Sequence, residues 1–482
     1  MYFSTSIILD NNSTMIKHYI SALFLAFSSL IQANDEIKNK IDAILANDQK
    51  EAISVFIYDP ISMDTIYSKD IYNNLIPASN VKLYTTAAAL HLLPNQEYLL
   101  TKVYTNDVEL EDSVINGNIY LKGFGDALLT TENLDSLVDQ LLLMGINKIT
   151  GDIIADDSYF DNTYTRDDWI TDERANVKLP PISGLSLNRN SVIINFNSNL
   201  PNGRTPTFTI EPNGNFYNVI NYSKVSSARV YPRISYRTEL NNINIKIEGS
   251  VRKRKSTYGY IVHPDSPSEL IANVFKTRLQ NKGIEVLGSA VSGATPLSVI
   301  ELATSRNSFA ILVDRVNKRS DNYLAENLFK IIGAEFSNKQ GNSFYATQAI
   351  LSFLDENDIY NEGTVLVDGS GISRFNKTST ASIVSLLEFM YLDINNFDFY
   401  FNSLAISGRD GTLENRMYES NAYLNFRGKT GSLNGVSSLS GYLTTKSNRD
   451  LIISIIINFK SKGGNYYKSL QDRIISYLAE SL

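Results

Sequence analysis

The sequence contains no cysteine and only three histidines among its 482 residues. The lack of cysteine excludes disulfides, thiolate metal sites, a cysteine nucleophile and a cysteine-linked lipid anchor. With so few histidines and no H-E-x-x-H segment, the sequence also argues against a histidine zinc site, and we expect neither a metal nor a cofactor. The formal net charge of −7 leaves no basic footprint for nucleic acid.

Long hydrophobic runs are also missing, since no later segment approaches the ~20 apolar residues of a membrane-spanning helix. One shorter apolar run, YISALFLAFSSLI at 19–31, follows the basic Lys17. With a plausible cleavage point after Ala33, this pattern indicates a signal peptide over residues 1–33; a buried N-terminal helix is the alternative. The polar stretch before Met15 fits no signal peptide, so Met15 is a candidate for the true start. We expect an exported protein without an integral membrane anchor.

The composition changes twice along the mature chain, whose length suggests two or three domains. Residues 34–97 combine helical spacing with a strand hairpin, whereas residues 98–296 are mostly short strands broken by Gly, Asn and Asp. Helices return in residues 297–482, which end in strands and an amphipathic helix. We expect the first and last segments to form one domain interrupted by a β-rich insertion, whose two ends must then lie close together.

The stretch IPASNVKLYTTAAALHLL at 76–93 predicts a helix whose first turn presents Ser79 and Lys82 on one face. A serine hydroxyl is a poor nucleophile without a base, and a lysine can be that base if burial destabilises its ammonium form. A helix N-terminus also offers a backbone N–H and the positive end of the dipole to a developing oxyanion. Alone, S-x-x-K is weak evidence, because it recurs at Ser250 and Lys253, which we interpret as coincidence.

Two further motifs make the pattern specific. Ser320-Asp321-Asn322 lies in a loop beside a predicted helix, and Lys429-Thr430-Gly431 lies in a predicted strand. The S-x-N pattern also occurs at Ser186, but Lys-Thr-Gly occurs once. Three motifs in this order, each in its proper setting, indicate serine acyl-transfer chemistry.

In these motifs the chain resembles the penicillin-binding proteins and serine β-lactamases. More narrowly it resembles the class C low-molecular-mass penicillin-binding proteins, the D-alanyl-D-alanine carboxypeptidase/endopeptidase family. The resemblance covers nearly the whole mature chain and includes the long interval between Ser79 and Ser320. The other similar stretches are DGSGISRFN (368–376), ISGRDGTL (406–413), GDIIADDSYFD (151–161) and ISGLSLNRN (182–190), while GFGDALLT (123–130) departs from the family's usual GDPTLT-like stretch.

This resemblance implies an α+β fold, with a transpeptidase-like antiparallel sheet flanked by helices and two inserted β-rich domains. The catalytic domain would comprise residues 34–97 and 297–482. The first inserted domain would comprise 98–181 and 257–296, and the second 182–256. A periplasmic location, peptidoglycan stem peptides as substrates and β-lactams as ligands are implied as well.

The resemblance also implies the roles of the motif residues. Ser79 would attack the carbonyl between two D-alanines with Lys82 as general base, and Ser320 would relay a proton to the leaving amine. Asn322 would hold Lys82 and a substrate amide, and Lys429 would supply positive potential. The hydroxyls of Thr430 and Ser432 would hold the terminal carboxylate of the substrate. A side chain at Gly431 would obstruct a substrate that lies along the strand. The backbone N–H groups of Ser79 and Ser432 would form the oxyanion hole.

A diaminoacid in the third position of the stem peptide would need a carboxylate and a cation beyond the reacting carbonyl. Asp156 is the candidate for the amine, with Asp157 close behind, and Arg374 is the candidate for the carboxylate. A solvated turn at Asp156 and a structural salt bridge at Arg374 remain open alternatives.

Two other function classes share these motifs. A serine β-lactamase needs efficient deacylation, but the chain has no E-x-x-L-N segment between the second and third motifs and is longer than such an enzyme requires. A non-catalytic penicillin-binding or sensor module would not need intact motifs.

Overall fold

The computed structural model describes residues 35–107, 113–169, 179–239 and 242–482. The signal peptide expected over residues 1–33 lies outside this part of the chain. Within it, no helix has both the length and the apolar character needed to cross a bilayer.

A six-stranded antiparallel sheet joins the two ends of the described chain, in the order β18-β19-β20-β21-β1-β2. The strands are β1 (Ala52–Asp59), β2 (Asp64–Lys69), β18 (Ala405–Ile406), β19 (Phe426–Leu433), β20 (Val436–Thr444) and β21 (Asp450–Asn458). The register Val55↔Ile455 in the β1–β21 pair shows directly that the sheet combines the expected first and last segments.

This sheet is covered by helices on both faces, which explains the nearly continuous apolar run of β21. A helix over residues 35–45 and α10 (Gly464–Ser481) share one hydrophobic core with it. The second core lies between the opposite face and a helical layer. That layer comprises α2 (Val81–Leu92), α5 (Phe309–Lys318), α6 (Asn322–Ser337), α7 (Ser343–Glu356), α8 (Thr380–Leu392) and α9 (Phe397–Ser403).

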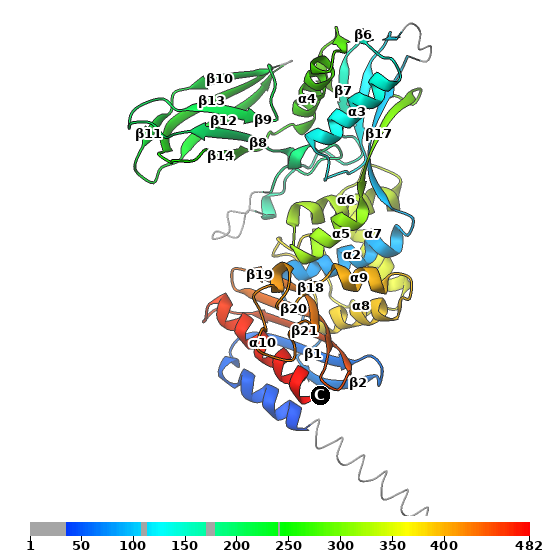
Figure 1. Cartoon of the computed structure of the whole chain (residues 1–482). Helices are drawn as coiled ribbons and strands as arrows, with labels where there is room; N and C mark the ends of the chain where they lie inside the picture. Colours follow the sequence, from blue (N-terminus) through cyan, green and yellow to red (C-terminus); the bar gives the residue numbers. More distant parts are fainter. Residues whose placement is uncertain (1–34, 108–112, 170–178, 240–241) are drawn as a thin grey trace, which may run out of the picture.

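Between α2 and α5 the chain forms a separate α/β unit (Figure 1). Its five-stranded sheet has the order β16-β7-β5-β3-β17, and a three-stranded sheet has the order β15-β6-β4. The elements are β3 (Tyr98–Thr105), β4 (Val114–Ile115), β5 (Ile119–Gly123), α3 (Thr131–Leu143), β6 (Lys148–Ile149), β7 (Ile153–Asp156), α4 (Pro267–Asn281), β15 (Glu285–Val286), β16 (Ala290–Ser292) and β17 (Ile300–Ser308). Tyr98 pairs with Ser308, so the first and last strands of this unit lie side by side.

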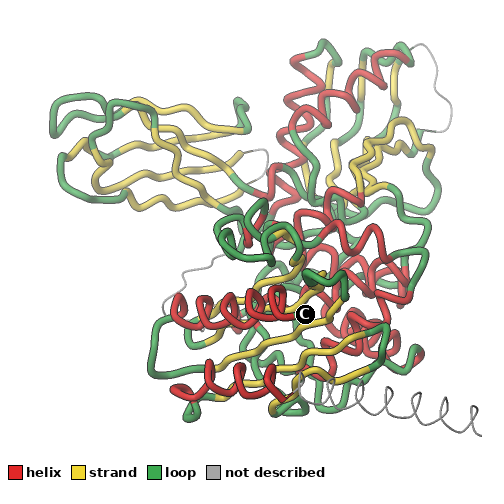
Figure 2. The backbone as a smooth tube through the Cα atoms, turned by 60° about the horizontal axis from the view of Figure 1, so that its bottom comes forward, coloured by secondary structure: helices red, strands yellow, loops and turns green. Residues whose placement is uncertain are grey.

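A β-sandwich is inserted into this α/β unit and stands apart from the rest of the molecule in Figures 1 and 2. One sheet has the order β14-β8-β9; in the other, β13 pairs with β10, β11 and β12. The strands are β8 (Val192–Asn197), β9 (Thr207–Glu211), β10 (Tyr217–Asn221), β11 (Lys224–Ser226), β12 (Pro232–Glu239), β13 (Asn242–Arg252) and β14 (Tyr258–Val262). The apolar side chains between the two sheets belong to a core that continues into the α/β unit.

Strand pairing differs from the expected domain limits at two strands. β14 lies within the range assigned to the first inserted domain (257–296), but it pairs with β8 of the sandwich. β17 lies within the range assigned to the catalytic domain (297–482), but it pairs with β3 of the α/β unit. Both strands occur where the chain crosses between units, and backbone pairing with a distant strand leaves no trace in local composition.

Candidate active site

Ser79 lies in a short 3-10 turn, η2 (Ala78–Asn80), which leads directly into α2. The backbone before it is unusual, because Ala78 has a φ of 49° and is fully buried. Side chains of the sheet hold this turn in place: Ser438 donates to the Pro77 carbonyl at 2.6 Å, and Asn80 donates to Ser440 at 2.7 Å. The nucleophile candidate therefore stands on a turn fixed to the centre of the sheet.

Lys82 is fully buried and its Nζ reaches back to Ser79. Its ammonium donates to Ser79 Oγ at 3.1 Å and to Asn322 Oδ1 at 2.7 Å, and it also bonds the Ser370 carbonyl. Burial lowers the pKa of Lys82 to about 8, even though nearby carboxylates raise it. A lysine in this state gives up its proton at a pH where an exposed lysine keeps it.

Two of those carboxylates lie beneath the site and have no role in the sequence predictions. Glu326 accepts from the Ser370 backbone N–H at 2.7 Å, and Asp368 accepts from the Gly371 and Ser373 N–H groups at 2.8 Å each. Burial raises the pKa of both acids, and in Glu326 the charge of Asp368 raises it further. They fasten the loop whose carbonyl, at Ser370, binds Lys82.

Ser320 occupies the loop between α5 and α6 with a φ of 56°. The next residue, Asp321, caps α6 by accepting from the Leu324 N–H at 3.2 Å. Asp321 is also bound bidentately by Arg189, at 2.7 and 2.9 Å, from the chain that leads into β8. An arginine of the insertion thus steadies the loop that carries the second motif.

Lys429 lies on β19, fully buried, and donates to Ser320 Oγ at 2.8 Å. It also donates to the Thr430 carbonyl at 2.9 Å. Burial and the proximity of Lys82 lower the pKa of Lys429 well below its usual value. The third motif is therefore connected to the second by a hydrogen bond and to the first by charge.

The outer edge of β19 is only half covered. β18 pairs with Arg427 and Gly428, and no other strand of the described part of the chain pairs with this edge beyond them. Thr430 and Ser432 lie on that part and line the cavity, with Thr430 donating to Thr412 Oγ1 at 2.8 Å. An extended peptide has room to lie along this edge.

Gly431 has a role different from the expected one. We expected a side chain here to obstruct substrate, but a Cβ would lie 2.1 Å from Ser438 Oγ and 2.7 Å from the Pro77 carbonyl oxygen. Both atoms belong to the protein interior behind Ser79. The glycine allows β19 to approach the Ser79 turn, and it does not line the cavity.

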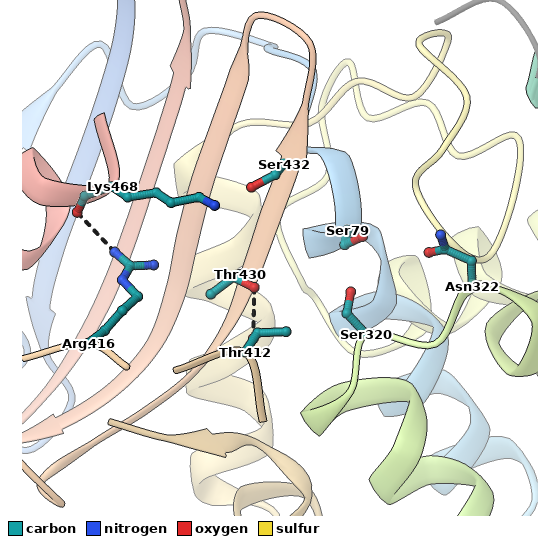
Figure 3. Close-up of a pocket in the computed structure, with 8 residues that line it drawn as sticks. All are labelled: Ser79, Ser320, Asn322, Thr412, Arg416, Thr430, Ser432 and Lys468. Atoms are coloured by element: carbon teal, nitrogen blue, oxygen red, sulfur yellow. Dashed lines mark hydrogen bonds between the residues drawn. The ribbon is translucent and has the colours of Figure 1, made fainter. Parts of the chain in front are cut away.

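The cavity at the three motifs has a volume of about 430 Å³. In Figure 3, Ser79, Ser320 and Asn322 lie close together on one side, and the side chain of Lys468 extends from α10 toward Ser432 on the other. Sequence reasoning missed three of its residues: Thr412, Arg416 and Lys468. Thr412 belongs to the stretch ISGRDGTL, which the resemblance had singled out, whereas Arg416 and Lys468 carry no local signal.

The two missed cations differ in their partners. Arg416 is paired with Asp472 at 2.7 Å and donates to the Lys468 carbonyl at 3.0 Å. The Lys468 ammonium has no hydrogen-bond or ion-pair partner among the residues that the structure describes. The cavity therefore contains one uncompensated positive charge at the end opposite Ser79.

Arg374 lies outside the cavity lining, next to the turn that follows β19. Its guanidinium donates to the Asn434 carbonyl, two residues beyond Ser432. The predicted role in binding a substrate carboxylate remains a prediction.

Asp156, the candidate for the substrate amine, is placed differently from the prediction. Its carboxylate is fully buried, 3.2 Å from Lys122 Nζ, and accepts from the Ser158 and Thr295 N–H groups at 2.9 and 2.7 Å. These three partners are all groups of the protein, and Asp156 does not line the cavity. The geometry gives it a structural role at the end of β7. Asp157 accepts from Tyr164 at 2.8 Å.

No cluster of metal-ligating side chains occurs within the described ranges.

Comparison with known proteins agrees with this geometry. The model of the D-Ala-D-Ala carboxypeptidase 3 (S13) family matches residues 37–480. A D-alanyl-D-alanine carboxypeptidase of Actinomadura is 29% identical over 92% of this chain and 85% of its own length. The carboxypeptidase DacB of Haemophilus influenzae is 24% identical, over 84% of each chain.

Among solved structures, penicillin binding protein 4 from Haemophilus influenzae superposes with a TM-score of 0.77 at 22% identity. The match covers 91% of this chain and 99% of that one, and the same protein has been solved in complex with a β-lactam. The structural likeness establishes the shared fold, and the family match covers nearly the whole sequence. This chain belongs to the D-Ala-D-Ala carboxypeptidase 3 (S13) family.

Proposed function

We propose that the protein is a serine D-Ala-D-Ala carboxypeptidase/endopeptidase that cleaves peptidoglycan stem peptides through an acyl-enzyme at Ser79. The observation that carries the proposal is the contact between Ser79 Oγ and Lys82 Nζ at 3.1 Å, with a lysine whose pKa burial lowers to about 8. A base of that pKa, held against the nucleophile, is what serine acyl transfer requires.

In acylation, Lys82 accepts the Ser79 hydroxyl proton as Oγ bonds to the carbonyl carbon between the two D-alanines. The oxyanion is stabilised by the backbone N–H groups of Ser79 and Ser432. As the C–N bond breaks, Ser320 passes its hydroxyl proton to the leaving amine. Lys429, which donates to Ser320 at 2.8 Å, then supplies Ser320 with a new proton. Water then adds to the ester carbonyl and gives a proton through Ser320 to Lys429. When the tetrahedral adduct collapses, Lys82 returns its proton to Ser79 Oγ, which restores the starting state.

Substrate is positioned along the uncovered edge of β19. The terminal carboxylate lies against the hydroxyls of Thr430 and Ser432, beside Thr412, and Lys468 supplies the counter-charge from α10. Asn322 holds Lys82 at 2.7 Å and offers its amide to the peptide. The same arrangement accommodates a β-lactam, whose carboxylate replaces that of the terminal D-alanine.

The proposed substrate lies outside the inner membrane of a bacterium, so the protein has to be exported. The apolar run at 19–31 with its basic start supports a signal peptide, and we propose a periplasmic location.

The function is tested by incubating the protein with purified muropeptides and identifying the products by mass spectrometry. Release of one D-alanine, or cleavage of a cross-link, supports the proposal. Rapid turnover of penicillin without either product would indicate the β-lactamase alternative, and stable binding of penicillin without any product would indicate a sensor module.

A further inference from the structure

The charge of the β-sandwich is opposite to that of the rest of the chain. Residues 192–262 contain ten Lys or Arg and three Asp or Glu, whereas the whole chain carries a formal net charge of −7. The ten are Arg204, Lys224, Arg229, Arg233, Arg237, Lys246, Arg252, Lys253, Arg254 and Lys255, and the three are Glu211, Glu239 and Glu248. A basic module on an acidic protein points to an anionic partner for that module.

Strand alternation gathers several of these cations on one face of one sheet. On β12, Ile234 and Tyr236 pack on the sandwich core, so Arg233 and Arg237 point the other way and are exposed. On β13, Ile243, Ile245 and Ile247 are buried in the same core. Lys246 therefore lies on the outer face, opposite Ser235 and between the two arginines.

The same face continues over the neighbouring strands. Lys224 on β11 is exposed and pairs in register with Ser250 of β13, and Arg252 ends β13 on the exposed side. Two large apolar side chains stand among these cations: Ile220 is 54% exposed and Tyr222 is 60% exposed. We call Lys224, Arg233, Arg237, Lys246 and Arg252, with Ile220 and Tyr222, the basic face.

Acidic residues offset only part of this charge. Glu248 pairs with Lys246 at 2.8 Å, and Glu239 lies 3.7 Å from Arg237. Such exposed pairs contribute little and are easily exchanged for a stronger counter-ion. Five cations against two carboxylates leave the basic face positive.

We propose that the basic face docks on an anionic lipid bilayer. Its cations all point outward from one sheet of the sandwich, and the sandwich projects to one side of the remainder of the molecule (Figure 1). Exposed isoleucine and tyrosine among cations match the boundary between headgroups and acyl chains. A soluble polyanion would pair with the cations but gives no reason for the apolar side chains.

This docking is peripheral and electrostatic. It needs no spanning helix, and it holds the catalytic sheet near a membrane surface while the active site remains in solution. Salt weakens it, because exposed charges are screened beyond about 8–10 Å at physiological ionic strength.

The test is co-sedimentation of the full chain with two kinds of vesicle. One is phosphatidylcholine alone, and the other contains about 30% phosphatidylglycerol as the anionic lipid. The test variant is Arg233→Ser/Arg237→Ser/Lys246→Ser. The matched control is Lys50→Ser/Lys339→Ser/Lys460→Ser, which removes three exposed lysines outside the sandwich. All variants share the same N-terminal apolar segment, so the ratio of anionic to neutral vesicle binding isolates the basic face.

We expect the wild type and the control to prefer anionic vesicles and the test variant to bind them about 100-fold more weakly, at roughly 5-fold for each cation removed. Acylation by penicillin should be unchanged, which also verifies folding. Equal binding by the test variant and the control would overturn the proposal. So would a loss confined to purified peptidoglycan sacculi, which would assign the basic face to a cell-wall polymer.

Discussion

At the scale of single residues, the site is defined by two buried lysines that serve different partners. Lys82 contacts Ser79 and Asn322, whereas Lys429 contacts Ser320. Burial destabilises the charged form of both lysines, so the pKa of each is lowered. The carboxylates near Lys82 limit this shift and keep its pKa within reach of neutral pH.

The pKa of Lys82 predicts the pH dependence of acylation. Only the neutral amine accepts the Ser79 proton, so the second-order rate of acylation by penicillin should rise about tenfold per pH unit below pH 8 and level off above it. Stopped-flow measurement between pH 5.5 and 9.5 tests this. A rate that is flat across pH 8, with the fold intact by circular dichroism, would exclude Lys82 as the base.

Lys468 is the residue whose role sequence reasoning missed most clearly. If its free ammonium binds the terminal carboxylate, Lys468→Met should slow acylation by benzylpenicillin about tenfold while acylation by the methyl ester, which lacks the charge, changes little. Lys468→Arg should preserve most of the rate. The control is Lys460→Met, on the exposed surface before α10. Equal slowing with both compounds would make Lys468 a packing residue.

At the scale of elements, three segments distant in the sequence meet at Ser79. Local patterns predicted the helix after Ser79, the loop at Ser320 and the strand at Lys429, because turn chemistry and apolar spacing are local properties. They could not predict the spacing between the segments. That spacing depends on contacts such as the one at Gly431, where β19 lies against the Pro77 carbonyl.

The role of Asp156 also depends on a contact between distant segments, which local patterns do not predict. Its position at the end of a strand allowed either a ligand role or a solvated turn. Its ion pair with Lys122 distinguishes between these roles. Lys122 lies 34 residues earlier in the sequence, on β5, and pairs in register with Asp156 on β7. A cross-strand ion pair of this kind is invisible until the strands are aligned.

The structural role of Asp156 predicts a loss of stability rather than of selectivity. Asp156→Asn leaves Lys122 beside a neutral amide and weakens two backbone hydrogen bonds, so the free energy of unfolding should fall by ~1–3 kcal/mol. Urea denaturation measures this loss. Hydrolysis of stem peptides with a free or a capped third-residue amine should change by the same factor. A selective loss for the free amine would restore the ligand role.

At the scale of the whole molecule, composition predicts an insertion over residues 98–296, because short strands broken by Gly, Asn and Asp replace the helical spacing of the flanking segments. In the structure the chain leaves α2 and returns to α5 through the paired strands β3 and β17. The exact limits at β14 and β17 were wrong, since both strands pair with distant partners. Lys468 enters the site because α10 packs against the sheet at β20, and Arg416 is held there by its ion pair with Asp472 of the same helix.

The central claim, that Ser79 is the acylated nucleophile, is tested most directly by mapping a penicillin adduct. After brief incubation with penicillin, digestion and mass spectrometry should place the adduct on the peptide that contains Ser79. Ser79→Ala should carry none and should lose roughly 10⁶-fold in turnover while keeping its fold. An adduct on Ser320 or Ser250, or undiminished labelling of Ser79→Ala, would contradict the account.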